Sequence, residues 1–211
     1  MPRQNRVTPF GEIVRASWRG EFTGNRGCLH DDRGELGVRR WRHQNWVCCL
    51  TSFRGRKRDP MPPGRWTALF FWDEAVALTA GHRPCGECRY TDYHRFMDAW
   101  RAAGLPWDGP REVDKHLHRN RVTRQREQVR YQAKCADLPD GTFVMGERIG
   151  RAPLLLMHGR VWKLCPEDGG YQAAGPAPKA ATVLTPRPMV DVIRAGYAPS
   201  IALDRHSAPD R

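Results

Sequence analysis

Two cysteines separated by two residues are the clearest chemical feature of this sequence. Cys85 and Cys88 enclose a Gly-Glu turn, and Arg83 and Arg89 flank the pair. A tight turn of this length brings two thiolates to one face, where they can hold one side of a tetrahedral zinc ion. Reduced thiols or a redox dithiol are the alternatives, but no thioredoxin-like βαβ pattern surrounds the pair. The spacing therefore predicts a structural zinc site.

The residues before this pair extend the motif. Phe70-Phe71 precedes a short Ala-rich stretch, which leads into Ala80-Gly-His-Arg-Pro-Cys-Gly-Glu-Cys88-Arg. This run resembles the zinc-binding domain at the N-terminus of the Ada DNA-repair protein, over about residues 46–96 only. The resemblance implies that Cys85 and Cys88 bind zinc and that Arg83 approaches a DNA phosphate. In that family, two upstream cysteines complete the site, and one zinc-bound cysteine accepts a methyl group from a DNA phosphotriester.

Upstream, the sequence departs from the family pattern, because Cys48 and Cys49 are adjacent rather than a few residues apart. Neighbouring side chains in a strand point to opposite faces, so we expect only one of these two to face the ion. The altered spacing also argues against methyl transfer. A thiolate suits structural zinc, which favours Cys28 as the fourth ligand. The full set of candidates for that position is Cys28, His30, His43 and His82.

The charge of the chain predicts a polyanionic partner. The 211 residues carry a formal net charge of +12, an excess that an enzyme of small metabolites does not need. DNA is the expected partner, although RNA is not distinguished and a solvated surface without a partner is the alternative. The expected nucleic-acid contacts are Arg26, Arg54, Arg56, Lys57, Arg58, Arg83 and Arg89, with Trp46 and Trp66 as aromatic contacts.

A polar segment at residues 24–32 holds candidates for catalysis. Asn25 can orient a water or a sugar, Arg26 can fix a phosphate, and Asp31 can stabilise a developing positive charge. Excision of a base from DNA needs these groups, together with aromatic side chains that hold the extruded base. A structured turn with exposed charges is the alternative. The predicted catalytic residues are Asn25, His30, Asp31 and, in a second acidic segment, Glu12, with Trp41, Trp46 and Trp66 for stacking.

These features together predict a zinc-stabilised DNA-binding protein that processes damaged or modified DNA, in repair or in defence against foreign DNA. Base excision, by hydrolysis of the N-glycosidic bond, is the first expectation. The alternatives are a non-catalytic DNA-binding or regulatory protein, a methyl-accepting cysteine protein, and a nuclease. The nuclease alternative rests on His116 and Asn120, which share one face of an expected helix.

The hydrophobic pattern predicts an α+β fold. Strands at 46–53 and 65–72 are expected to form a hairpin with a cationic tip, followed by a short helix between Asp73 and Gly81. Later elements follow from apolar periodicity and turn residues. They are a helix after the cysteine pair ending near Gly104, a basic helix at 111–134, strands at 142–145, 154–157, 161–164 and 181–184, a flexible loop at 169–178, and a final helix ending near Gly196.

Three regions are expected to pack as one unit: a zinc-containing DNA-binding region at 1–110, a basic helix at 111–136, and a β-rich region at 137–211. An odd number of cysteines, seven, favours a reducing compartment over disulfides. The N-terminal residues lack the apolar core of a secretory signal, so a cytoplasmic protein is expected. No apolar run approaches the roughly 20 residues that a membrane-spanning helix needs.

Overall fold

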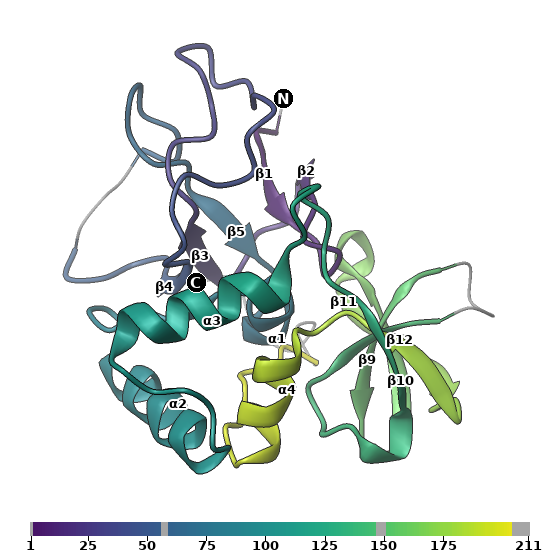
Figure 1. Ribbon diagram of the computed structural model, residues 1–211. Helices are drawn as coiled ribbons and strands as arrows, with labels where there is room; N and C mark the ends of the chain where they lie inside the picture. Colours follow the sequence, from purple (N-terminus) through teal and green to yellow (C-terminus); the bar gives the residue numbers. More distant parts are fainter. Residues whose placement is uncertain (1, 56–58, 147–150, 204–211) are drawn as a thin grey trace.

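The computed structural model describes residues 2–55, 59–146 and 151–203. Within these residues, four α-helices accompany two six-stranded sheets (Figure 1). The predicted α+β class is confirmed. None of the described helices is both long enough and apolar enough to cross a membrane.

The first sheet is built from the N-terminal part of the chain, with the strand order β2-β1-β5-β3-β4-β6. Strands β1 and β5 are parallel, as are β4 and β6, and the other neighbours are antiparallel. The strands are β1 (Gln4–Val7), β2 (Ile13–Arg15), β3 (Phe22–Asn25), β4 (Val47–Leu50), β5 (Leu69–Phe71) and β6 (Arg83–Pro84).

The predicted hairpin between the strands at 46–53 and 65–72 is wrong, because β3 lies between β4 and β5 and pairs with both. Gly24 and Asn25, the first two residues of the polar segment, therefore belong to a central strand. Gly24 allows this, since a Cβ atom there would lie 2.5 Å from the Phe71 ring and 2.8 Å from the Val47 carbonyl oxygen. Only a residue without a side chain fits between the two neighbours.

Helix α1 (Glu74–Thr79) lies between the two sheets and is buried along its whole length. As predicted, the Asp73 side chain caps the helix by accepting from the Val76 N–H at 2.9 Å, and Gly81 follows with φ +84°. The other carboxylate oxygen of Asp73 accepts from the Tyr171 hydroxyl at 2.8 Å and from the Ala202 N–H at 3.2 Å. The helix start is thereby tied to the C-terminal part of the chain.

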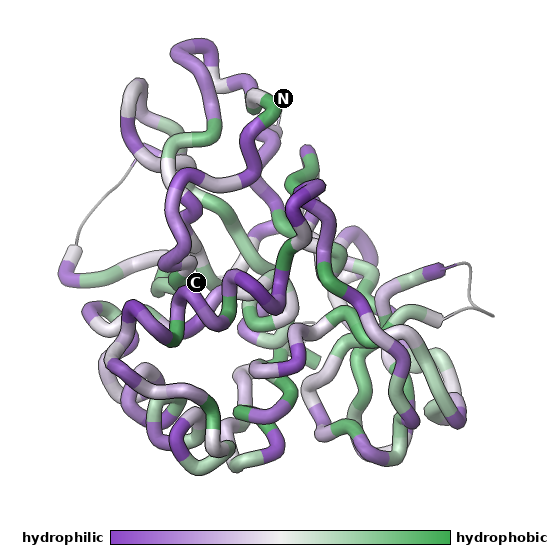
Figure 2. Tube along the Cα trace, in the orientation of Figure 1, coloured by the Kyte–Doolittle hydropathy of each residue, from purple (hydrophilic) through white to green (hydrophobic). Residues whose placement is uncertain are grey.

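Three further helices form a layer beside α1: α2 (Tyr90–Ala102), α3 (Pro110–Arg121) and α4 (Arg187–Arg194). The helix α2 agrees with its prediction, but the basic helix expected at 111–134 ends at Arg121. Residues 131–134 instead form strand β7, which pairs with β12. Figure 2 shows that α3 is mostly hydrophilic along its length. Its buried apolar residues are Val113 and Leu117.

The second sheet is antiparallel throughout, with the order β11-β10-β9-β8-β12-β7. The strands predicted at 154–157 and 161–164 form the antiparallel pair β9–β10, with a turn at His158-Gly159 between them. Residues 169–178, expected to be a flexible loop, largely form β11 and pair with β10. The strands are β7 (Tyr131–Lys134), β8 (Phe143–Met145), β9 (Pro153–Met157), β10 (Arg160–Cys165), β11 (Gly170–Pro176) and β12 (Ala180–Val183).

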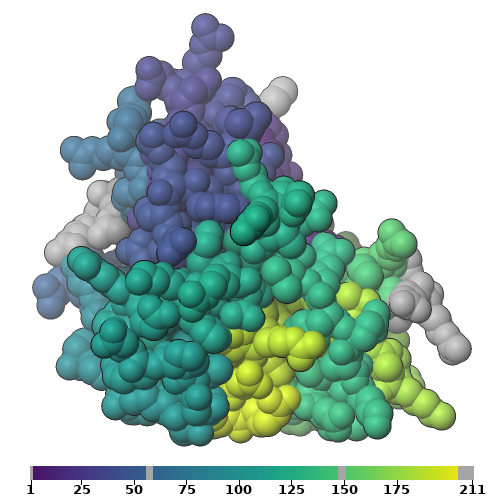
Figure 3. Space-filling model, in the orientation of Figure 1, coloured from purple at the N-terminus to yellow at the C-terminus, as the bar shows by residue number. Residues whose placement is uncertain are grey.

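One buried hydrophobic cluster joins the two sheets. Leu69 and Phe71 of the first sheet belong to the same buried cluster as Phe143 and Leu155 of the second, with α1 between them. On the face drawn in Figure 3, the segment after α3 lies directly against the N-terminal part of the molecule. A hydrogen bond from Arg126 Nη1 to the Val38 carbonyl oxygen joins these parts.

Candidate metal centre and arginine pocket

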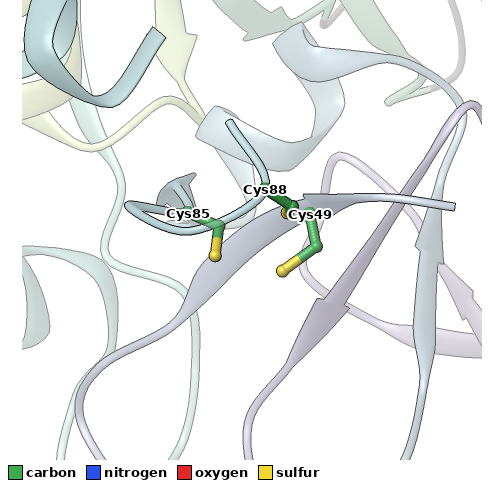
Figure 4. A group of neighbouring side chains, drawn as sticks. All are labelled: Cys49, Cys85 and Cys88. Carbon is green, nitrogen blue, oxygen red and sulfur yellow. The ribbon is translucent and has the colours of Figure 1, made fainter. Parts of the chain in front are cut away.

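Three cysteines gather at the edge of the first sheet (Figure 4). The sulfur atoms of Cys49, Cys85 and Cys88 all lie within 4.8 Å of one another. In a tetrahedral zinc site with Zn–S bonds of about 2.3 Å, the sulfurs are about 3.8 Å apart, so small side-chain rotations suffice to hold the ion. The three cysteines could therefore hold a metal ion.

Strand pairing positions the three sulfurs. The parallel pairing of β4 with β6 ends in a hydrogen bond from the Cys85 N–H to the Cys48 carbonyl oxygen at 2.9 Å, which sets the turn beside Cys49. Two backbone N–H groups then point at sulfur, from Leu50 to Cys88 Sγ and from Glu87 to Cys85 Sγ, each at 3.4 Å. Donors aimed at sulfur favour the thiolate, which is the form that binds metal.

The three thiols also change one another's pKa values. Hydrogen bonds from Cys49 and Cys88 hold the pKa of the Cys85 thiol far below its ordinary value. Bonds to the Cys85 and Cys88 sulfurs and burial raise the pKa of Cys49 in turn. The cluster therefore carries one thiolate readily, and a divalent cation is what allows the others to deprotonate.

Cys48 and Cys28 stand outside this cluster. The Cys48 side chain points to the opposite face of β4, is fully buried, and accepts from Arg89 Nη1 at 3.4 Å. Burial raises the pKa of the Cys48 thiol. Cys28 instead contacts the His30 carbonyl oxygen at 3.5 Å. Of the adjacent pair, Cys49 is thus the one that joins the cluster, and Cys28, the favoured fourth ligand, lies outside it.

The remaining candidates for a fourth ligand are engaged elsewhere. His30 contacts Thr67 Oγ1, His43 contacts Asn25 Oδ1, and His82 accepts from Arg26 Nε. No other Cys, His, Asp or Glu among the residues that the structure describes joins the three cysteines. Among the described residues, the cluster therefore offers three sulfur atoms to a metal ion.

Arg83 and Arg89 do not form a phosphate-binding surface beside the cysteines. Arg83 is buried in a two-pronged ion pair with Asp114, with both N–O distances at 2.8 Å. Arg89 is buried between Glu74 and Asp92, each at 2.8 Å. Their charges are neutralised inside the protein, which corrects the expectation that they contact DNA.

A second feature is a pocket of about 490 Å³ between the β1–β2 turn, the segment before β4 and the chain after α3. It brings together four residues that the sequence singles out: Glu12, Arg26, Trp41 and Trp46. Trp41 lies at its wall, as does Gln128. The pocket is strongly cationic, because its lining includes Arg26, Arg40, Arg121, Arg126 and Arg130 against the carboxylates of Glu12 and Glu127.

Arg26 and Arg121 form the buried part of this pocket, with 3% and 2% of their surface exposed. Both guanidinium groups stack on the Trp46 ring, at 4.1 and 3.8 Å from its centroid. Trp46 itself is 1% exposed, so its ring orients the arginines and has no free face for a base. Gly81 makes room for Arg121, since a Cβ atom there would lie 2.4 Å from Arg121 Cδ.

Two histidines beside the arginines are held neutral. Burial lowers the pKa of His82 well below its ordinary value, and the charges of Arg26 and Arg121 lower it further. Burial, with Arg121 nearby, also lowers the pKa of His118 to about 4. His82 Nε2 accepts from Arg26, and His118 Nδ1 lies 3.1 Å from Arg121 Nη2. Neutral imidazoles can accept from both arginines without cancelling their charge.

The predicted catalytic side chains of the polar segment at 24–32 do not converge on one place. Asp31 is exposed, and its Oδ1 atom accepts from the N–H groups of Arg33 and Glu35, which lowers the pKa of its carboxyl. Asn25 Oδ1 accepts from the Gly27 N–H, and His30 is buried against Thr67. These are contacts of a structured turn, the alternative reading of the segment.

The other predicted contacts are scattered. Arg54 is exposed near Phe53, whereas Arg56, Lys57 and Arg58 lie outside the described residues. Trp66 lines a small hollow of about 90 Å³ that also contains the three clustered cysteines. His116 packs on Trp100, and Asn120 donates to the His116 carbonyl oxygen, so these two side chains do not converge on a ligand.

The pocket residues that sequence reasoning missed are Arg40, Arg121, Arg126 and Arg130. The last three fell in the stretch expected to be one continuous basic helix. The Thr123 to Gln128 turn after Arg121 breaks that helix and brings the arginines to the pocket. Comparisons with protein-family models, with curated proteins and with solved structures found no match to this chain.

Proposed function

We propose that this is a zinc-stabilised DNA-binding protein that processes damaged or modified DNA, with base excision as its reaction. One observation carries the proposal: a carboxylate, Glu12, stands in a pocket lined by five arginines and by Trp41. The pocket is large enough for a nucleotide, and its charge suits the phosphates around an extruded base.

The sequence offered two carboxylates for the catalytic role, Asp31 and Glu12, and we assign that role to Glu12. It lies in the tight turn between β1 and β2, where its carbonyl oxygen accepts from the Thr8 N–H at 3.0 Å. Gly11 precedes it with φ +76°, a conformation that favours glycine. Glu12 is exposed and lines the pocket, as does Arg26.

In the proposed reaction the bond between C1′ of the sugar and the base nitrogen breaks, and its electron pair leaves with the base. The Glu12 carboxylate stabilises the positive charge that develops on the sugar and takes a proton from the water that adds to C1′. Pocket arginines hold the flanking phosphates. Trp41, which is partly exposed, offers the aromatic contact that buried Trp46 cannot.

Zinc is proposed as a structural ion at Cys49, Cys85 and Cys88, where it would fix the turn after β6 against β4. All seven cysteines are free of disulfides. Since the site needs reduced thiols, we place the protein in the cytoplasm.

The test uses duplex DNA that carries single alkylated, deaminated or oxidised bases, followed by alkaline treatment and a denaturing gel. We expect the protein to create alkali-sensitive sites on at least one such duplex. Glu12→Gln should reduce this activity by about 100-fold or more, the usual contribution of a general base. Asp31→Asn, which changes an exposed turn carboxylate away from the pocket, is the matched control and should retain activity.

Intact strands on every substrate would overturn base excision. Tight binding without cleavage would then favour the non-catalytic regulatory protein. A methyl group found on the protein by mass spectrometry would favour the methyl-accepting alternative, for which Cys49 is the accessible cysteine of the adjacent pair.

A further inference from the structure

Four arginines are buried among the described residues, and they divide into two kinds. Arg83 and Arg89 each contact a carboxylate at 2.8 Å. Arg26 and Arg121 have no ion pair with any carboxylate that the structure describes, although they are equally buried. A buried guanidinium without a counter-charge is costly, and native proteins rarely keep one without a reason.

The hydrogen bonds of this pair hold the guanidinium groups without neutralising them. Arg26 donates to His82 and to the carbonyl oxygens of Gly11 and Ala80, at 3.3 to 3.4 Å. Arg121 donates to the Gly81 carbonyl oxygen at 2.7 Å and to that of Gln44 at 2.5 Å.

Each group therefore retains unused donors. A guanidinium has five N–H groups, and the Nε atom of Arg121 is buried with no partner among the described residues. Both side chains line the pocket. The unused hydrogen-bonding capacity of the pair is thus available to a group that enters it.

The lowered pKa values of Arg26 and Arg121 agree with this geometry. Burial, and then the nearby charge of Arg40, lowers the pKa of Arg26 to about 9. Burial also lowers the pKa of Arg121, and the charge of Arg26 adds to the effect. Burial and mutual repulsion thus disfavour the charge on both guanidinium groups, and an anion between them would offset both costs.

We propose that Arg26 and Arg121 form a binding site for the dianion of a phosphomonoester at the base of the arginine pocket. Three exposed arginines, Arg40, Arg126 and Arg130, line the pocket above them and attract the anion towards the site. Each donor of the buried pair is fixed by packing on Trp46, so little side-chain freedom is lost on binding.

A monoester fits this site better than a phosphodiester for two reasons. A phosphomonoester carries a charge of about −1.5 to −2 at pH 7, which matches two guanidinium groups, whereas a diester carries one charge. The pair is also 3% and 2% exposed, so a ligand must project into the pocket to reach it. A terminal phosphate can project in this way, whereas a phosphate within a strand is tethered on both sides.

The site can belong to a free nucleotide or to the end of a nucleic-acid strand, since both present the same group. The assignment goes beyond base excision and does not depend on it. A pocket that binds a terminal phosphate would recognise a strand end or a break, and Glu12 at its wall would then face the terminal nucleotide.

Isothermal titration calorimetry with inorganic phosphate, at constant ionic strength in chloride, is the first test. We expect one site per chain in the wild type. Arg121→Lys should weaken it by about tenfold or more, because a lysine cannot supply the planar fork of donors. Arg126→Ala changes an exposed pocket arginine, preserves the buried pair, and should weaken binding by about two- to fivefold.

Arg160→Ala, an exposed arginine on β10 outside the pocket, is the matched control and should bind phosphate as the wild type does. If Arg121→Lys does not fold, as judged by circular dichroism, Arg126→Ala against Arg160→Ala decides the question. A wild-type protein that responds to phosphate no differently than to chloride would overturn the site.

The second test compares 3′-labelled single strands with and without a 5′-phosphate, by fluorescence anisotropy. We expect the phosphorylated strand to bind the wild type about tenfold more tightly, with the difference lost in Arg121→Lys. Equal affinity for the two strands, with inorganic phosphate still binding, would restrict the site to free phosphomonoesters and refute strand-end recognition. Phosphate binding without any base excision would refute the proposed reaction alone.

Discussion

Cys48 and Cys49 are neighbours in the chain, but their side chains lie on opposite faces of β4. Cys49 meets Cys85 and Cys88, while Cys48 is buried against Arg89. The alternation of a strand predicts this division, and the CxxC spacing predicts two of the three ligands. Which of the two adjacent cysteines faces the ion depends on the pairing of β4 with β6, which the sequence does not reveal.

We predict that Cys49→Ser lowers bound zinc well below one ion per chain after dialysis, because two thiolates hold the ion less tightly than three. Cys48→Ser is the matched variant one residue away and should retain the zinc of the wild type. Elemental analysis of both purified variants provides the measurement. Loss of zinc from Cys48→Ser with retention in Cys49→Ser would contradict the assignment.

At the residue scale, the sequence does not predict whether a given arginine is buried, paired or exposed. The sequence places Arg83 beside the cysteine pair, but its partner is Asp114, 31 residues further along the chain. Arg121 looks like one more charge of a basic helix, yet it is among the most buried side chains. Whether an arginine is paired inside the protein or faces a pocket depends on long-range packing, and composition alone carries no such information.

At the scale of elements, the sequence predicts those helices and hairpins whose ends are set by capping and turn residues. The N-cap Asp73 and Gly81 fix α1, and the His158-Gly159 turn fixes the β9–β10 hairpin. Pairing across long sequence distances was not predictable, as β3 shows by inserting between β4 and β5. The length of α3 was overestimated because charge continues past its end, whereas its backbone hydrogen bonds do not.

The start of α1 concentrates several bonds on one buried carboxylate, so we predict a large effect of Asp73→Ala. The change removes a helix cap worth about 1 kcal/mol. It also leaves the buried Tyr171 hydroxyl and the Ala202 N–H without an acceptor, at about 1–3 kcal/mol each. Urea unfolding should show a loss of roughly 3 kcal/mol or more. Asp98→Ala, at an exposed position on α2, should change stability by about 0.5 kcal/mol or less.

The effect of Asp73 should also depend on pH in an unusual direction. Burial raises the pKa of Asp73 from 3.8 to about 6. The folded protein therefore binds a proton at this site over a pH range in which the unfolded chain does not. Its contribution to stability is full below about pH 3.8 and is lost as pH rises through about 6. The stability difference between wild type and Asp73→Ala should accordingly be larger at pH 5 than at pH 7.5, and a larger difference at pH 7.5 would contradict this.

At the scale of the whole molecule, five of the arginines that contribute to the net charge of +12 line one pocket. The charge itself predicts a polyanionic partner from composition alone. The location of the site could not be predicted, because its walls come from four parts of the chain: the β1–β2 turn, the segment before β4, the end of α1 and the turn after α3. Only the folded chain assembles them.

We predict that DNA affinity falls steeply with salt, through release of counterions. If Arg40, Arg126 and Arg130 each contact one phosphate, they add about −3 to the slope of log K against log salt concentration. Replacing all three with alanine should reduce the slope by that amount. Alanine at Arg95, Arg101 and Arg160, which are exposed outside the pocket, should leave it nearly unchanged. Anisotropy titrations at several salt concentrations measure both slopes.

The two acids at the start of α1 have a consequence for how this chain matures. Glu74 accepts from the Tyr197 hydroxyl and the Ser200 N–H, and Asp73 accepts from the Ala202 N–H, across 123 to 129 residues. During synthesis, α1 cannot form these hydrogen bonds until the C-terminal residues 197–202 have been made. Until these partners are present, the carboxylates cannot be dehydrated without a free-energy penalty, so we expect α1 to dock late in synthesis.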